Sequence, residues 1–195
     1  MLPLTDMVRP RRRPWVTLAL LGANVAVWAA YQLPAGLEAS VEEVGFRACS
    51  LAGDCSGDPT SWTVTATTSM FAHGGWAHLV GNMAFLLALG PRVEGELGAL
   101  RYACLYLAAG YAATFAEAGA ELAFMTHAET DVPSIGASGA ISAVMAAYLV
   151  LFPFARILTL VLPMFFLRAP ALALLLVWFG LQALEATYGL THPSA

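Results

Sequence analysis

Long apolar runs alternate along the chain with shorter polar segments, and five of these runs approach the length of a membrane-spanning helix. A spanning helix needs roughly 20 mostly apolar residues to cross a hydrocarbon core about 30 Å thick. The runs cover about residues 15–33, 70–90, 100–124, 135–152 and 169–186. This pattern predicts an all-α, polytopic helical membrane protein. A further apolar stretch at 157–166 is too short to span and is expected to be an interfacial connection.

The composition agrees with a membrane protein and excludes other classes. Hydrophobic residues make up 59% of the 195-residue chain and charged residues only 11%, whereas about a quarter of the residues in a typical soluble domain are charged. Lys is absent and the net charge is −4, so the chain has no basic surface for a nucleic acid. The expected surroundings are a lipid bilayer.

The positions of the arginines predict the orientation, because short cytoplasmic loops collect basic residues. Residues 1–14 carry four arginines and are expected to form a basic cytoplasmic arm, followed by one membrane domain over residues 15–195. With the N-terminus inside, eight of the nine arginines fall on the inner side, and Arg47 in the outer loop at 34–69 is the exception. The short arm and the lack of Lys favour a bacterial inner membrane.

Three cysteines are too few for a disulfide scaffold or a cysteine-based zinc site. Cys49 and Cys55 share the outer loop, where they either form a small disulfide loop or stay as free thiols, because spacing alone does not establish bond geometry. Cys104 lies in the third run and is expected to be an inert packing residue.

Polar residues within the apolar runs are the first candidates for function, because they are costly in a membrane. His78 and Asn82 are four residues apart and share one helical face. Ser138 lies between Gly136 and Gly139 at a predicted helix start, where free N–H groups can stabilise an anion. Each feature also has a structural explanation, as interhelical hydrogen bonds or as a small-residue packing face. Together they supply a nucleophile and oxyanion donors, the parts that acyl transfer requires.

Glu117 and Glu121 lie four apart near the outer end of the third run. They could line water above the candidate site, but a solvated helix end is the favoured interpretation.

Four segments carry a family resemblance: WTVTATTSMFAHGGWAHLVGNM, PRVEGELG, PSIGASGAISAVMAAYLVLFPFAR and LTLVLPMFFLRAPALALLLVWFGLQAL. In this order, the His and Asn four apart, the V-E-x-x-L-G turn and the G-x-S-G sequence resemble the rhomboid family of intramembrane serine proteases. That family has a core of six helices, so the resemblance implies a rhomboid-like bundle with five of the six. It also implies cleavage of transmembrane protein substrates near the outer membrane face, without metal or cofactor.

The resemblance implies a role for each matching residue. Ser138 would be the nucleophile, His78 and Asn82 would form the oxyanion hole with the backbone at Ser138, and Gly136 and Gly139 would allow close helix packing. Glu94, in the turn after the second helix, would be a structural residue at the inner surface.

The general base is where the sequence departs from the family pattern, because rhomboids carry that histidine on a sixth helix. Three interpretations stay open. In the first, the chain is a rhomboid protease given without its last helix. In the second, the base is His192, near the C-terminal end, or His127, in the loop before the serine. In the third, the protein is a rhomboid-like binder of transmembrane helices that does not cleave them.

Overall fold

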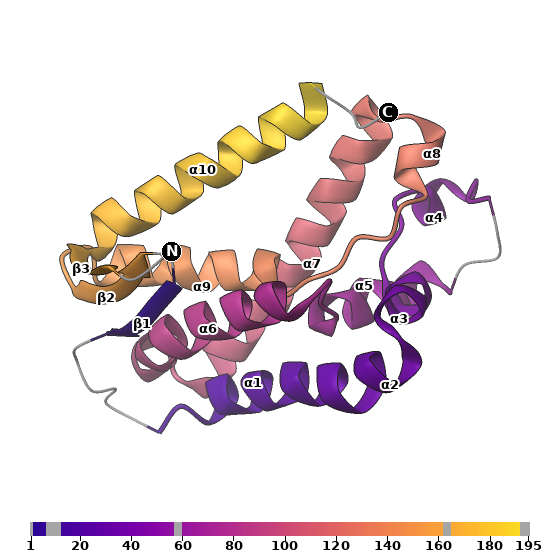
Figure 1. Ribbon diagram of the computed structural model, residues 1–195. Helices are drawn as coiled ribbons and strands as arrows, with labels where there is room; N and C mark the ends of the chain where they lie inside the picture. The colour runs from indigo at the N-terminus through magenta and orange to yellow at the C-terminus, as the bar shows by residue number, and fades with distance from the viewer. Residues whose placement is uncertain (1, 7–12, 57–59, 162–164, 192–195) are drawn as a thin grey trace.

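The computed structural model describes residues 2–6, 13–56, 60–161 and 165–191, and it is mostly helical (Figure 1). All five predicted runs form helices. The first run is α1 (Trp15–Val27), continued by a π-helical turn, η1 (Trp28–Gln32), and by α2 (Leu33–Ala35). The others are α6 (Trp76–Leu97), α7 (Ala99–Phe124), α9 (Ser138–Leu151) and α10 (Ala171–Thr191).

The second helix is shifted from its predicted position. Residues 70–75 precede α6, because Ser69–Phe71 form the short 3-10 helix η2 and Gly74 and Gly75 follow it. At the other end, the expected turn PRVEGEL is the last part of α6, which passes through Pro91 and ends at Gly98 with a φ of 80°. Gly98 adopts this positive φ without the steric penalty of a Cβ.

The structure is mostly helical as predicted, but three strands that were not predicted form an antiparallel sheet in the order β1-β2-β3. The strands are β1 (Leu2–Asp6), β2 (Arg156–Val161) and β3 (Phe165–Pro170). The stretch expected as an interfacial connection therefore contains strand residues, and part of the N-terminal arm pairs with it. Within β2, Ile157 and Thr159 are buried while their neighbours are more exposed, which is the alternation of a strand.

The outer loop also has structure of its own. It contains α3 (Leu37–Val44), α4 (Cys49–Ala52) and α5 (Trp62–Thr68), and α8 (His127–Thr130) lies in the connection before α9. Cys49 and Cys55 form a disulfide with a Cα–Cα distance of 5.0 Å, which resolves the alternative left open above. Cys104 is exposed, so the expectation that it packs inside the protein is wrong.

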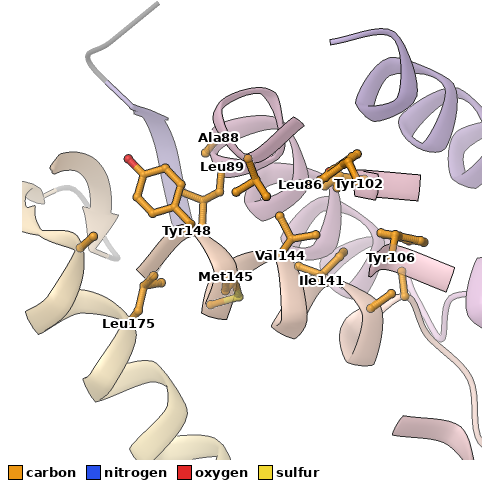
Figure 2. Packing of buried hydrophobic residues seen from close by; sticks show 14 of the residues in the cluster. Leu86, Ala88, Leu89, Tyr102, Tyr106, Ile141, Val144, Met145, Tyr148 and Leu175 are labelled. Atoms are coloured by element: carbon orange, nitrogen blue, oxygen red, sulfur yellow. The ribbon is translucent and has the colours of Figure 1, made fainter. Parts of the chain in front are cut away.

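The core lies around α9, which contacts α6, α7 and α10. Figure 2 shows side chains from these helices meeting, among them Leu86, Tyr102, Ile141, Met145 and Leu175, all of which are buried. α10 packs through its first turns only: Figure 1 shows it leaning away from α9 beyond them, and most of its later described residues are exposed. The core therefore fixes α9 firmly, whereas α10 contributes buried residues to it mainly from its first turns.

A buried carboxylate joins α1 to α6. Glu94 is only 4% exposed. It accepts hydrogen bonds from the backbone N–H groups of Val16 and Thr17 at 2.9 and 2.8 Å, and from the Thr17 hydroxyl at 2.8 Å. Glu94 thus satisfies donors in the first turn of α1, which agrees with the structural role that the resemblance implied.

Within the described ranges, one helical stretch, Trp15–Ala35, is long and apolar enough to cross a membrane by length and composition. The helices Ser138–Leu151 and Ala171–Leu184 are apolar but shorter.

Candidate functional site

Ser138 is the first residue of α9, and its side chain is exposed. Hydrogen bonds hold the chain just before it. Phe46 and Ser134 exchange two backbone hydrogen bonds of 2.9 and 2.7 Å, and the Gly136 N–H donates to the Ser69 carbonyl at 2.8 Å. The first N–H groups of a helix have no partner inside that helix, so the start of α9 can offer donors beside the Ser138 hydroxyl.

The structure brings His78 of α6 to the same place. A Cβ built on Gly136 would lie 2.9 Å from His78 Nε2 and 3.6 Å from Ser138 Oγ. The imidazole and the hydroxyl therefore flank one glycine. Gly136 also has a φ of +132°, which L side chains rarely adopt. A glycine is required here both for its conformation and for the approach of the His78 ring.

The hydrogen bonding of His78 indicates which ring nitrogen carries the proton. The Gly74 N–H donates to His78 Nδ1 at 3.3 Å, so Nδ1 acts as an acceptor. In a neutral imidazole the other nitrogen is then the donor. Nε2, the atom beside Gly136, is therefore the N–H that can be offered to a developing oxyanion.

Asn82 lies one turn further along α6. Its Nδ2 is buried and has no hydrogen-bond partner within the described part of the chain. An unpaired buried amide is costly unless something uses it.

Gln32 belongs to the surroundings of the site, although the sequence reasoning missed it. Its side chain is fully buried. It accepts from the His73 N–H at 2.8 Å and donates to the His73 carbonyl at 3.0 Å. The His73 ring lies 5.0 Å from the His78 ring in an edge-to-face arrangement. A polar residue in the first apolar run was the available signal.

A cavity of about 120 Å³ opens beside the serine. Its lining includes Ser138, Gly136, Thr114 and Glu117. Glu117 is exposed, as a solvated helix end would be, and it also lines this cavity, so both interpretations of this residue stay open. Gly139 lies on the same wall, where a Cβ would overlap the Ala113 side chain, so this glycine permits α7 and α9 to pack closely.

The residues that the structure describes do not supply the general base. His127 lies in α8, is exposed, and has its Nδ1 3.4 Å from the Asp54 carboxylate. His192 lies outside the described residues. Among the described histidines, His78 is the one placed against the chain before Ser138, and its Nδ1 is already occupied.

One group of possible metal ligands, Cys49, Cys55 and Asp131, occurs in the described ranges. The two sulfurs are joined in the disulfide, and a metal-binding cysteine must be a thiolate. This group therefore does not fit a metal ion.

The described chain is mostly helical, and it brings His78 of α6 and Ser138 of α9 close to the same glycine, Gly136. The sequence model of the Rhomboid domain matches residues 60–192. The chain belongs to the rhomboid family and is an integral membrane protein.

Individual relatives agree with this assignment. The chain is 34% identical to RHOMBOID-like protein 5 of Arabidopsis thaliana over 80 residues, which are 41% of this chain and 24% of that protein. It is 34% identical to the mitochondrial presenilin-associated rhomboid-like protein of Bos taurus over 97 residues, 50% of this chain and 25% of that protein. It is 32% identical to the mitochondrial Rhomboid protein 1 of Saccharomyces cerevisiae over 146 residues, 74% of this chain and 39% of that protein.

The chain thus matches between 24% and 39% of the length of these relatives. No solved structure gives a significant match. The relatives are plant or mitochondrial proteins, so the comparisons give no support to the expected bacterial inner membrane.

Proposed function

We propose that this chain is an intramembrane serine endopeptidase that cleaves transmembrane proteins near the outer face of the membrane. Ser138 is the nucleophile, and His78, Asn82 and the Ser138 N–H form the oxyanion hole. The observation that carries the proposal is that His78 Nε2 and Ser138 Oγ lie 2.9 and 3.6 Å from the same Cβ position built on Gly136. A hydroxyl beside a directed N–H donor is the minimum arrangement for acyl transfer.

In the proposed reaction a general base takes the Ser138 hydroxyl proton while Oγ attacks the carbonyl carbon of the substrate. The negative charge moves to the carbonyl oxygen, where the N–H groups of His78 and Asn82 stabilise it. The base then gives the proton to the leaving amine as the peptide bond breaks. Water, deprotonated by the same base, releases the acyl group from Ser138.

The length of α9 supports a site below the membrane surface. Its 14 residues correspond to about 21 Å of helix, less than the roughly 30 Å of a hydrocarbon core. With the N-terminus inside and the inner end of α9 at the boundary, Ser138 lies about 9 Å below the outer boundary. The proposal therefore places α1, α6, α7, α9 and α10 across the bilayer, and a bond of a transmembrane substrate near its outer end comes within reach.

The test is labelling of the purified full chain in detergent with a fluorophosphonate, a probe that reacts with activated serines. The proposal expects labelling that Ser138→Ala abolishes. Ser142→Ala, one turn along the same helix, is the matched control and should keep its labelling. Labelling that survives in Ser138→Ala would refute the nucleophile assignment.

Asn82→Ala tests the oxyanion hole. Loss of one such donor generally slows the reaction by about 10²- to 10³-fold, and we expect a loss of that size with unchanged helical content by circular dichroism. A labelling rate equal to the wild type would remove Asn82 from the site.

The base is tested in the same assay with His192→Ala and His127→Ala. The variant that loses labelling identifies the base. If both variants label like the wild type, neither histidine has this role.

One observation favours a second function. Because the described histidine beside the Ser138 segment is His78, and its Nδ1 accepts from Gly74, the described residues alone do not complete a catalytic pair. The alternative is a rhomboid-like protein that binds transmembrane helices without cleaving them. A folded chain that resists the probe yet retains a single-span peptide in a detergent pull-down would support this alternative.

A further inference from the structure

A hydrogen-bonded cluster in the outer loop converges on Asp131, seven residues before the serine. Arg47 Nη1 donates to Asp131 Oδ1 at 3.2 Å, and the Ser56 N–H donates to Oδ2 at 3.3 Å. The Ser56 hydroxyl also donates to Oδ2. Asp131 thus holds two parts of the outer loop, one on each side of the Cys49–Cys55 disulfide.

The disulfide determines whether these partners can stay together. Cys49 is fully buried, and its Sγ lies 3.4 Å from Asp131 Oδ1. Ser56 directly follows Cys55, so the bond between the two sulfurs keeps Ser56 next to Asp131. Without that bond, the segment from Cys55 to Ser56 is attached to Asp131 by exposed hydrogen bonds, for which water competes.

The chain between Asp131 and Ser138 is held to the same loop. A Cβ on Gly45 would lie 2.5 Å from the Pro133 Cβ and 3.3 Å from the Ile135 side chain, so the backbone at Gly45 is in close contact with this segment. The paired hydrogen bonds between Phe46 and Ser134 lie at the next position. We call residues 131–138 the nucleophile-bearing segment, because it ends at Ser138.

Resting on the proposed function, we propose that the Cys49–Cys55 disulfide, through Asp131, positions the nucleophile-bearing segment, so that Ser138 is reactive only while the disulfide is intact. Asp131 is a positioning residue in this arrangement. Reduction by a dithiol transfers two electrons and two protons to the two sulfurs, breaks their bond and converts the dithiol to its own disulfide. The protein would then require an oxidising outer side, and a reducing one would lower its activity.

The experiment compares oxidised and dithiol-treated protein in a Cys104→Ser background, which removes the exposed free thiol. Mass spectrometry confirms the state of Cys49 and Cys55. The first measurement is amide hydrogen exchange, and we expect at least a tenfold faster exchange at residues 131–138 after reduction, with unchanged exchange in α6 near Glu94. The second is fluorophosphonate labelling, which should slow by at least tenfold. The Cys49→Ser/Cys55→Ser variant should match the reduced protein and no longer respond to dithiol.

Asp131 variants separate positioning from general stability. Asp131→Ala should reproduce the reduced protein in both measurements, whereas Asp131→Asn keeps an acceptor oxygen for Ser56 and should recover most of the labelling rate. Equal losses in these two variants would overturn the positioning role.

The outcomes also separate this inference from the proposed function. Reduction that leaves exchange at 131–138 unchanged, or that speeds exchange equally throughout the molecule, overturns the inference even if Ser138 is labelled. Faster local exchange in a chain that is never labelled supports the coupling of disulfide to segment and refutes the proposed protease activity.

Discussion

Replacing Glu94 by alanine is expected to detach the start of α1 from α6. The residue before α1 is Pro14, and it provides no side-chain cap for the helix. Glu94, far away in sequence, does this instead, because its two oxygens accept from the N–H groups of Val16 and Thr17 and from the Thr17 hydroxyl. The carboxylate also lies at the helix N-terminus, where the helix dipole favours a negative charge.

The expected loss of stability follows from the donors that alanine at position 94 would leave without an acceptor. Hydrogen bonds to a charged group contribute about 1.5–3 kcal/mol each, but these three share one carboxylate and their contributions do not add fully. Removing a helix cap costs about 1 kcal/mol, and leaving buried donors unpaired raises the cost. We therefore expect Glu94→Ala to lower the free energy of unfolding by about 3 kcal/mol. Glu94→Gln should cost less than alanine, because it keeps one acceptor oxygen but points an NH₂ group at donors.

The assay is equilibrium unfolding in mixed micelles with increasing SDS, followed by tryptophan fluorescence. Thr17→Val completes a double-mutant cycle and should cost about 1 kcal/mol alone, with little further effect in the Glu94→Ala background. A Glu94→Ala protein within about 0.5 kcal/mol of the wild type, the range of ordinary surface substitutions, would refute the assignment of Glu94 as the cap of α1.

Three further predictions use single substitutions. Gly136→Ala should abolish fluorophosphonate labelling, because it introduces a Cβ 2.9 Å from the His78 ring at a φ of +132°; labelling at the wild-type rate would contradict this geometry. Gly139→Ala should destabilise the packing of α9 on α7 in the SDS assay, whereas Gly119→Ala, which meets nothing within 4 Å, should not; equal stability of the two would count against close packing at Gly139. Hydrogen bonds from Ser56 and Arg47 hold the pKa of Asp131 below its ordinary value of 3.8. The ionised Asp131 therefore stabilises the folded protein at pH values above 3.8, and this stabilisation is lost as the pH falls through the lower pKa of the folded state. The wild type should be more thermally stable than Asp131→Asn at neutral pH, and this difference should shrink toward about pH 3. A difference that stays constant with pH would contradict the prediction.

The helices could be predicted from sequence and the small sheet could not. Each of the five long helices lies largely in an apolar run that is visible without any knowledge of the fold, whereas the short helices of the outer loop and α8 do not. Strand β2 is apolar at nearly every position after Arg156, so the period-two pattern of a strand is hidden in its sequence. Its partner β1 lies more than 150 residues away, with Leu2 opposite Leu160, and such pairing depends on tertiary structure.

The candidate site, like the fold, could be predicted from the sequence only in part. Ser138, His78 and Asn82 stand out because polar side chains are rare in apolar runs, and the structure places the first two around Gly136. The links of Gln32 to the His73 backbone and of Asp131 to Ser56 join residues more than 40 positions apart. Their residue types are ordinary, so only the folded chain indicates what they hold in place.

The tautomer of His78 separates two roles that a histidine beside a serine could have. With Nδ1 accepting from Gly74, the neutral ring can donate from Nε2 but cannot also take a proton there. His78 therefore fits an oxyanion donor, and the base must be another group. A serine enzyme without its base still keeps about 10³- to 10⁴-fold of rate enhancement from its oxyanion hole and substrate binding. Slow labelling that requires Ser138, His78 and Asn82 would therefore indicate a functional oxyanion hole that lacks its base, whereas slow labelling indifferent to His78→Ala would show that the hole itself is absent.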